Sequence, residues 1–579
     1  MAIIKRQKSE PIQSLYQKRI TLLALIIFFI SFVIIGRLFV LQIWDHSFYH
    51  DLAERRQEVL KNLLPLRGSI YTKEKDQLFP LVTNRDYYLV YAEPVKIKDA
   101  KKVIDAITPI LGLKEEEWQP LLAKLSKGSD PYEPIKHKVA KPEMEKIQAL
   151  KIEGIGILPE SYRFYPEKGI GGQLFGFVGF KGDEKIGQYG LEGYFNQPLT
   201  GKSGEIKSIK DALGSLITIG PRSIKKAENG VDLVLTIDRT VQFIACQKLK
   251  FYYDYFRAES GTVIIMKPSG EILAMCNYPD YDAENYGEVG NIDYFNNPAI
   301  FAAYEPGSVF KMVTMAAGLD SGKVTPESTY IDTGEVKIDS FTIRNSDLKA
   351  HGQQTMIQVL ENSLNTGVIF VEQLIGKETF QKYVKAFGFG QPTGITLDKE
   401  MPGDISPLDK PGRIYGMTSA FGQGITVTPL QLTAAFGAIA NKGTLVKPYL
   451  VSEIIHPDGK KEEFGPQTVR QVVDPKTATL LTGMLTSVVE RGYGKKAGVK
   501  GYYFAGKTGT AQVPAPGGGY GGKTIHTFVG FGPVSNPQFV MLVKLNNPSG
   551  PRFAEDTICP LFHDIAAYLL NYYQIPPDY

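Results

Sequence analysis

An uncharged apolar stretch near the start of the chain, "ITLLALIIFFISFVIIG" from Ile20 to Gly36, constrains its fold more than any other feature. The apolar character resumes after Arg37 and continues to Trp44, a residue type that is common at membrane–water interfaces. Residues 20–44 are long enough to cross the roughly 30 Å hydrocarbon core of a bilayer as one helix. We therefore expect a transmembrane helix here, and no second stretch of this kind follows in the sequence.

The charges before this stretch predict its orientation. Five basic residues precede it: Lys5, Arg6, Lys8, Lys18 and Arg19. By the positive-inside rule, residues 1–19 are then a cytoplasmic tail, and the rest of the chain lies outside the cytoplasm. A cleaved signal peptide is the alternative. Its apolar core would be shorter, and no cleavage site of two spaced small residues directly follows this stretch, so we expect a retained single-pass anchor.

Length, charge and cysteine content limit the number of domains, the kind of partner and the role of the cysteines. A chain of 579 residues is too long for one compact domain, so we expect several. The net charge of +4 gives no reason to expect nucleic acid as a partner. The three cysteines, Cys246, Cys276 and Cys559, lie far apart and lack the spacing of a metal site or of a disulfide framework, so we expect free thiols.

Two regions with different sequence patterns follow the apolar stretch. Residues 46–64 predict an amphipathic helix, and short β-like runs then alternate with charged helical segments, which lie between residues 99 and 150. Residues 202–229 are polar and basic, as expected of a hinge. A new unit begins at Gly230 with a strand, and Gly261–Met275 predicts two strands joined by a Pro-Ser-Gly turn.

The segment "YEPGSVFK" places Ser308 three residues before Lys311, directly after a Pro-Gly pair. A serine at such a position is more often a helix cap, because an apolar helical run follows it. On a helix, however, residues three apart share one face. The Lys311 amine could therefore take the proton of the Ser308 hydroxyl if burial and neighbouring positive charge lowered the lysine pKa. The tetrapeptide alone does not decide between the two roles, since such tetrads also occur by chance.

Two later motifs could supply what a nucleophilic serine needs, which is a proton relay and an anchor for the substrate. Ser363 and Asn365, in "ENSLNTG", offer a hydroxyl and an amide on one short turn. Lys507 opens "KTGT", which has the form of an edge strand, and Gly509 within it would let a ligand backbone approach closely. The lysine and the threonine hydroxyls of this motif suit a carboxylate. Each motif alone is weak, because both also occur for purely structural reasons.

In combination the three motifs are specific. The order Ser-x-x-Lys, Ser-x-Asn, Lys-Thr-Gly is the signature set of penicillin-binding proteins and class A β-lactamases. Other segments extend the likeness over nearly the whole chain, namely Arg67 to Ile70 ("RGSI"), the G-x-x-G-L-E run from Gly187 to Glu192, "TIDRTVQ", "GEILAM" and "FGQGITVTPLQL". The chain thus resembles a class B penicillin-binding protein, a monofunctional peptidoglycan D,D-transpeptidase.

This resemblance implies a mechanism and its catalytic residues. Ser308 attacks the D-Ala–D-Ala bond of a stem peptide after Lys311 takes its proton. Ser363 relays the proton towards the leaving amine, helped by the positive charge of Lys507, and Asn365 holds the amide of the donor peptide. Terminal D-Ala leaves, and an amine from a neighbouring stem peptide resolves the acyl-enzyme to form the cross-link. β-Lactams would acylate Ser308 by the same route and stay attached.

The resemblance also implies the binding residues and partners. Thr508 and Thr510 bind the terminal carboxylate on either side of Gly509, and the backbone N–H groups of Ser308 and Thr510 form the oxyanion hole. The chemistry needs no metal and no organic cofactor. The expected ligands are D-Ala-D-Ala stem peptides and β-lactam antibiotics. The expected partners are the membrane and, from the resemblance only, a multi-spanning glycosyltransferase.

For the fold, the resemblance implies an α+β architecture in four parts. A cytoplasmic tail (1–19) and a transmembrane helix (20–44) precede an elongated, mixed pedestal of the dimerisation type (46–229). A transpeptidase domain (230–579) then combines an antiparallel sheet with a helical subdomain. No glycosyltransferase domain is expected. The implied location is the bacterial cytoplasmic membrane, with the catalytic domain on its outer side.

Two other kinds of function fit part of the pattern. A D,D-carboxypeptidase or a β-lactamase would use water as the acceptor, but a long pedestal and a retained anchor fit a secreted β-lactamase poorly, and no motif supplies a deacylating glutamate. A membrane β-lactam sensor or a scaffold would not catalyse a reaction. Sensors typically need more membrane segments than the one predicted here.

Overall fold

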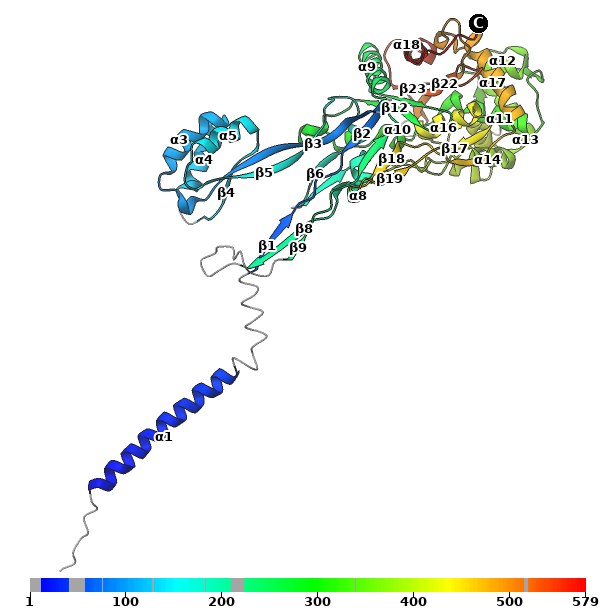
Figure 1. The fold of residues 1–579 in the computed structure, drawn as a ribbon. Helices are drawn as coiled ribbons and strands as arrows, with labels where there is room; N and C mark the ends of the chain where they lie inside the picture. The colour runs from blue at the N-terminus through cyan, green and yellow to red at the C-terminus, as the bar shows by residue number, and fades with distance from the viewer. Residues whose placement is uncertain are drawn as a thin grey trace, which may run out of the picture. The chain divides into compact units, whose positions relative to one another are not determined.

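We describe a computed structural model of the chain, in which the described residues are 12–40, 58–74, 77–127, 130–182, 184–209, 223–338, 340–514 and 519–579. The chain forms two compact units, Met1–Pro65 with Lys202–Glu228 and Leu66–Gly201 with Asn229–Tyr579, whose elements are labelled in Figure 1. Helix α1 (Ile12–Phe39) belongs to the first unit. Its part Ile20–Phe39 is long and apolar enough to cross a membrane, as predicted. Residues 41–44 of the predicted span lie outside the described residues.

The prediction of a helix over residues 46–64 is wrong at its C-terminal end. Strand β1 (Glu58–Leu63) pairs antiparallel with β8 (Gly204–Ile209), and β8 pairs with β9 (Ser223–Lys225). The partner of β1 lies far along the chain, so no local pattern of residues 46–64 could reveal the pairing. Residues 46–57, and residues 210–222 of the predicted hinge, lie outside the described residues.

The second unit contains a mixed seven-stranded sheet with strands from both of its sequence segments. The strand order is β19-β18-β10-β2-β3-β4, and β5 also pairs with β3. These strands are β2 (Ile70–Glu74), β3 (Gln77–Ala92), β4 (Glu133–Val139), β5 (Ile155–Phe164), β10 (Asp232–Leu235), β18 (Val451–Ile455) and β19 (Lys461–Glu463). The helical segments predicted between residues 99 and 150 are confirmed as α3 (Ala100–Leu111), α4 (Glu115–Leu125) and α5 (Lys141–Ala149).

Two of the segments that resemble family motifs meet at a buried carboxylate. Arg67 Nε donates to Glu192 Oε2 over 2.7 Å, and Arg163 Nε donates to Glu192 Oε1 over 2.6 Å. Glu192 is fully buried, so the two guanidinium groups provide the compensation that its charge requires. Gly187 leaves room for this contact, because a Cβ at that position would lie 2.4 Å from Arg67 Nη2. The "RGSI" and G-x-x-G-L-E segments therefore serve one purpose, which is to form the buried ion pair between Arg67 and Glu192.

A five-stranded antiparallel sheet forms the centre of the C-terminal part, with strand order β12-β11-β23-β22-β21. The strands are β11 (Ser260–Met266), β12 (Ile272–Tyr278), β21 (Ala505–Pro514), β22 (Tyr520–Gly532) and β23 (Phe539–Asn546). The two predicted strands in Gly261–Met275 are thus confirmed as β11 and β12. The Lys-Thr-Gly segment lies on β21 at the sheet edge, also as predicted.

Helices cover both faces of this sheet. Because side chains alternate along a strand, Met541 and Val543 of β23 face one cluster of apolar residues while Val540 and Leu542 face another. Helices α9 (Arg239–Tyr255) and α18 (Ala554–Tyr572) pack in the first cluster. The second cluster contains residues of the helical subdomain, namely α11 (Lys311–Asp320), α12 (Met356–Glu361), α13 (Asn365–Ile375), α14 (Lys377–Ala386), α15 (Arg413–Ser419), α16 (Pro429–Ala440) and α17 (Pro475–Glu490).

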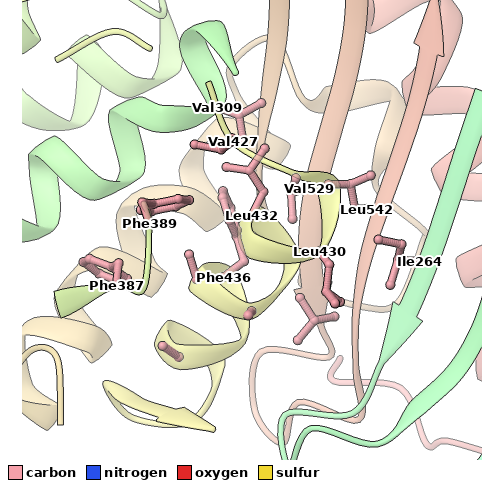
Figure 2. Packing of buried hydrophobic residues seen from close by; sticks show 14 of the residues in the cluster. Ile264, Val309, Phe387, Phe389, Val427, Leu430, Leu432, Phe436, Val529 and Leu542 are labelled. Atoms are coloured by element: carbon pink, nitrogen blue, oxygen red, sulfur yellow. The ribbon is translucent and has the colours of Figure 1, made fainter. Parts of the chain in front are cut away.

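Helix α16 connects the sheet to the helical subdomain. Its sequence is apolar on all sides, and Figure 2 shows Leu430, Leu432 and Phe436 between the sheet residues Val529 and Leu542 and the helical subdomain. A helix that is hydrophobic all round is expected to be buried in a core. The expected architecture of an antiparallel sheet with a helical subdomain is therefore confirmed, and the two parts share one continuous core.

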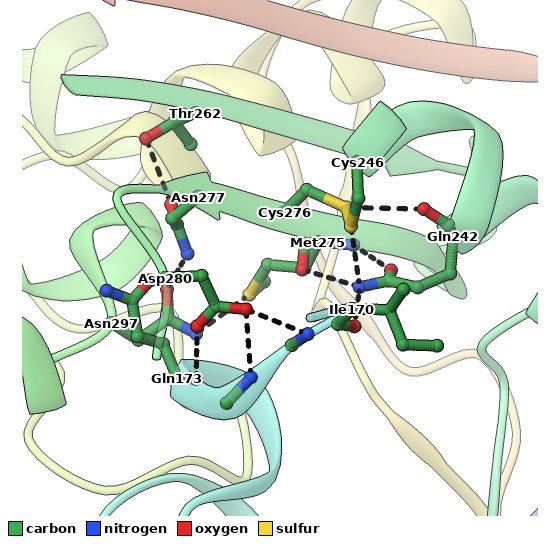
Figure 3. The surroundings of a disulfide bond; sticks show 12 residues. Ile170, Gln173, Gln242, Cys246, Thr262, Met275, Cys276, Asn277, Asp280 and Asn297 are labelled. Carbon is green, nitrogen blue, oxygen red and sulfur yellow. Dashed lines mark hydrogen bonds between the residues drawn. A yellow bond between two sulfur atoms is a disulfide. The ribbon is translucent and has the colours of Figure 1, made fainter. Parts of the chain in front are cut away.

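The prediction that all three cysteines are free is wrong for two of them. Cys246 of α9 and Cys276 of β12 form a disulfide with a Cα–Cα distance of 5.3 Å (Figure 3). They are 30 residues apart in sequence, and only the packing of α9 on β12 brings them together. Gln242 joins the same elements, because its Nε2 donates to Met275 O over 3.0 Å and to Ile170 O over 2.9 Å. Cys559 is free and buried.

Candidate active site

The three predicted motifs converge at the sheet edge formed by β21. Ser308 lies in the short 3-10 helix Gly307–Phe310, and Lys311 is the first residue of α11. Neither helix has a side-chain N-cap hydrogen bond, so the structure contradicts the interpretation of Ser308 as a cap. Ser363 lies in the turn between α12 and α13, where its φ of 51° is in the left-handed region. Lys507 lies on β21.

Both lysines donate hydrogen bonds to the same serine. Lys507 Nζ donates to Ser363 Oγ over 2.9 Å and to Thr508 O over 3.1 Å. Lys311 Nζ donates to Ser363 Oγ over 3.3 Å and also to the Ser363 carbonyl oxygen. Within the part of the chain that the structure describes, the Ser308 side chain forms no hydrogen bond, so Lys311 is not hydrogen-bonded to the hydroxyl whose proton it is predicted to take. Catalytic hydrogen bonds often tighten only when substrate binds.

Burial lowers the pKa of both amines. Lys311 and Lys507 are each 0% exposed. Burial, together with the positive charge of Lys507, holds the pKa of Lys311 well below its ordinary value. Burial also lowers the pKa of Lys507 to about 7. A lysine that readily loses its proton near neutral pH can act as a general base.

One cavity gives access to the site. Its volume is about 540 Å³, and its lining includes Ser308, Ser363, Asn365, Thr508 and Thr510. The cavity lies in the volume range of small-molecule sites, and these five polar side chains come from three separate chain segments. The side chains that we predict to contact substrate thus share one open space, while the two lysines lie buried.

Gly509 and Gly307 bring β21 close to the segment that carries Ser308. A Cβ at Gly509 would lie 2.6 Å from Val309 Cγ2 and 3.1 Å from the Pro306 carbonyl oxygen. A Cβ at Gly307, which has a φ of +56°, would lie 3.0 Å from the Ala511 Cβ. Gly509 is therefore needed for packing against the chain's own Ser308 segment, and its predicted role toward a ligand stays a prediction.

Asn365 is held by residues outside the three sequence motifs. Asn365 Nδ2 donates to the Arg344 carbonyl oxygen over 2.8 Å, and its backbone N–H donates to Asn345 Oδ1 over 3.0 Å. Residues 341–344 form strand β15, which pairs with β14 (Glu335–Ile338), and Arg344 and Asn345 also line the cavity. No motif in the sequence around Asn345 marks it, because its partner lies 20 residues away and is brought close only by the fold.

The chain matches two known families. A model of the penicillin binding protein transpeptidase domain matches residues 261–566, and a model of the penicillin-binding protein dimerisation domain matches residues 62–235. Stage V sporulation protein D of Bacillus subtilis is 34% identical over 86% of this chain and 77% of its own length. The peptidoglycan D,D-transpeptidase FtsI of Escherichia coli is 28% identical over 94% of this chain and 90% of its own length.

A solved structure shows the same relationship. Penicillin binding protein 3 of Mycobacterium tuberculosis, complexed with ampicillin, superposes with a TM-score of 0.68 at 26% sequence identity. The match covers 89% of this chain and 97% of that one. With the two family models and the converging motifs, these matches confirm the predicted resemblance: the chain belongs to the class B penicillin-binding proteins.

Proposed function

We propose that this protein is a serine D,D-transpeptidase that cross-links peptidoglycan stem peptides through an acyl-enzyme on Ser308. The observation that carries the proposal is the pair of buried lysines, Lys311 and Lys507, which both donate to Ser363 beside the cavity that Ser308 lines. This arrangement joins Lys311 as a base of lowered pKa, Ser363 as a hydroxyl relay and the positive charge of Lys507, which together can move one proton between nucleophile and leaving group.

The acylation step follows from these positions. Neutral Lys311 takes the Ser308 hydroxyl proton as Oγ attacks the carbonyl carbon of the penultimate D-Ala. The C–N bond to the terminal D-Ala breaks, and its nitrogen receives a proton through Ser363, which leaves an ester on Ser308. Developing negative charge on the carbonyl oxygen is stabilised by the backbone N–H groups of Ser308 and Thr510, and Thr508 and Thr510 bind the terminal carboxylate.

The second step reverses the proton path. The amine of a second stem peptide attacks the ester carbonyl, its proton returns to Ser308, and the new amide bond is the cross-link. Asn365 would hold the donor amide during both steps. A β-lactam would open its ring on Ser308 in the same way, but its leaving nitrogen stays tethered to the acyl group. The chain's own groups suffice for these steps, so we propose no metal or cofactor.

A test must separate this reaction from the alternatives. Solubilised protein is incubated with uncross-linked peptidoglycan, and mass spectrometry quantifies cross-linked dimers, tetrapeptides and free D-alanine. We expect one D-alanine for each cross-link, and loss of both products in Ser308→Ala. Tetrapeptides without dimers would instead identify a carboxypeptidase. Penicillin binding without any D-alanine release would identify a sensor or scaffold.

We also infer that the chain is anchored in the bacterial cytoplasmic membrane. Residues 20–44 would span it, 1–19 would remain in the cytoplasm, and the pedestal (46–229) and transpeptidase domain (230–579) would lie outside. A multi-spanning glycosyltransferase that supplies new glycan strands is the partner that the family suggests. In spheroplasts, an added protease should degrade the C-terminal domain while a tag on residue 1 stays protected. A protected C-terminal domain would contradict this orientation.

A further inference from the structure

Helix α13 begins at the proposed substrate-binding Asn365 but is not capped by the residue before it. Leu364 occupies the N-cap position and provides no side-chain hydrogen bond. The first backbone N–H groups of a helix have no partner within the helix and need one elsewhere. Asn345 provides it, because its Oδ1 accepts from the Asn365 N–H over 3.0 Å and from the Thr366 N–H over 3.3 Å. Asn345 is 20 residues away in sequence, so the fold supplies this cap from outside the helix.

The other end of the Asn345 amide is fixed by a buried carboxylate. Asn345 Nδ2 donates to the two carboxylate oxygens of Asp332 over 3.1 and 2.9 Å. Thr366 Oγ1 also donates to Asp332 over 2.7 Å, and the His351 backbone N–H donates over 3.0 Å. Burial acts to raise the pKa of Asp332, but these hydrogen bonds outweigh it and hold the pKa below its ordinary value. An ionised carboxylate near the start of a helix also interacts favourably with the helix dipole.

This network fixes the orientation of the Asn365 side chain. Asn365 Nδ2 donates to the Arg344 carbonyl oxygen over 2.8 Å. A carboxamide has two N–H donors and one acceptor oxygen, so this bond fixes the position of the Nδ2 end and leaves the second N–H and Oδ1 available to a ligand in the cavity that Asn365 lines. Arg344 directly precedes Asn345, so the same short segment holds both the backbone and the side chain of Asn365.

We propose that Asn345 and Asp332 are positioning residues that aim the Asn365 carboxamide at the amide of the acyl donor, and that they thereby set the preference for donors that carry such an amide. The proposal rests on the proposed function and goes beyond it, since neither residue belongs to the three motifs. Asp332 and Asn345 are each 2% exposed. Asn345 belongs to the cavity lining, but its Nδ2 and Oδ1 are both engaged by protein groups. They act through Asn365.

The test compares two β-lactams that differ in this amide. Benzylpenicillin has an acylamido side chain, and 6-aminopenicillanic acid has the same ring system without it. For each variant, the second-order rate constant of Ser308 acylation is measured with both compounds, and their ratio is the preference. In Asn345→Ala we expect the preference to fall by roughly tenfold, the loss of about one well-placed hydrogen bond, with the smaller compound much less affected.

Further variants separate positioning from a general loss of structure. Asn365→Ala should lower the preference as Asn345→Ala does, and the double variant should lower it no further, because both changes remove one interaction. Asp332→Asn keeps the side-chain shape and should lower the preference less. Asn297→Ala is the matched control, since Asn297 is another buried asparagine (5% exposed) that caps a helix, by accepting from the Ala299 N–H over 3.0 Å. It should lower the melting temperature without changing the preference.

Two results would overturn the proposal. One is an equal fall in both acylation rates in Asn345→Ala, which would make Asn345 merely structural. The other is an additive loss in the double variant. If Asn345→Ala does not fold, Asp332→Asn decides alone, and an unchanged preference in that variant counts against the proposal. Absence of any acylation in the unaltered protein would instead contradict the proposed function, so the two failures are distinguishable.

Discussion

Lys507 Nζ lies 2.9 Å from Ser363 Oγ, and Lys311 Nζ donates to the same atom over 3.3 Å. Ser363 therefore joins two buried amines that would repel each other if both were protonated. Neither amine can regain the hydration that it lost on burial, so the site favours at least one neutral lysine. In the proposed mechanism that lysine is Lys311.

This coupling predicts the pH dependence of acylation. Burial and the charge of Lys507 lower the pKa of Lys311, so acylation should rise with pH as Lys311 loses its proton. Lys507→Ala removes a neighbouring positive charge, which raises the pKa of Lys311 and should move the acidic limb to higher pH by about one unit. The rate of benzylpenicillin acylation between pH 5 and 9 measures the shift. Lys523→Ala is the control, at a lysine that pairs with Glu259 and does not line the cavity. A limb that stays in place or moves to lower pH would refute the coupling.

Lys311→Arg tests whether Lys311 is the base. Arginine keeps the positive charge but does not lose its proton in proteins, so the variant cannot activate the serine. We expect it to fold and to lose acylation by several orders of magnitude, because it removes an interaction of the chemical step rather than binding alone. Stopped-flow acylation gives the rate, and thermal unfolding checks the fold. Near-normal acylation would show that another group takes the proton.

The sequence predicted those elements of the fold that depend on residues close together in the chain. The apolar character of residues 20–36 and the helices between residues 99 and 150 can be read from neighbouring residues alone, and both are confirmed. Strand β1 was missed because its partner is distant in the chain. The disulfide was missed for the same reason, since Cys246 and Cys276 meet only when α9 packs on β12. Contacts between distant segments are the part that local patterns do not encode.

In the candidate active site, too, the contacts between distant segments could not be predicted from the sequence. The motifs predicted that Ser308, Ser363 and Lys507 would lie together, and the structure brings them to one place. It also shows what spacing could not, namely that Lys311 bonds to Ser363 and that Asn345 caps the helix of Asn365. A resemblance to a family identifies the residues that belong to its motifs. The residues that position those motif residues depend on the particular fold of this chain.

The raised pKa of Glu372 predicts an effect of pH on stability that is separate from the pH dependence of acylation. It is a buried residue of α13, and burial raises the pKa of its carboxyl to about 7, although Arg413 and Lys377 oppose the shift. Because the folded pKa lies above the ordinary value of 4.5, the contribution of Glu372 to stability is fully present below pH 4.5 and is lost as the pH rises through about 7. The loss is on the order of 3 kcal/mol. Glu372→Gln should therefore raise the melting temperature more at pH 8 than at pH 5.

Thermal unfolding at both pH values checks this prediction. Glu378→Gln, which replaces an exposed carboxylate on the next helix, is the control and should change the melting temperature little at either pH. An equal shift at pH 5 and pH 8 in Glu372→Gln would mean that the carboxyl of Glu372 does not titrate between them.

The disulfide between α9 and β12 should stabilise the transpeptidase part. A cross-link that closes a loop of this length typically contributes about 2–4 kcal/mol. Replacing both Cys246 and Cys276 by serine should lower the melting temperature, and dithiothreitol should lower that of the unaltered protein to a similar value. The reductant should leave the double variant unchanged. Alkylation of both thiols in protein that has not been reduced, detected by mass spectrometry, would contradict the bond.

The most direct test of the account asks which serine becomes acylated, because Ser308 and Ser363 line the same cavity and Lys311 contacts Ser363 in the free protein. The protein is treated with benzylpenicillin and digested, and the adduct is located by mass spectrometry in the unaltered chain, in Ser308→Ala and in Ser363→Ala. We predict an adduct on Ser308 alone, none in Ser308→Ala, and slower formation of the Ser308 adduct in Ser363→Ala. An adduct on Ser363, or one that survives Ser308→Ala, would contradict this prediction.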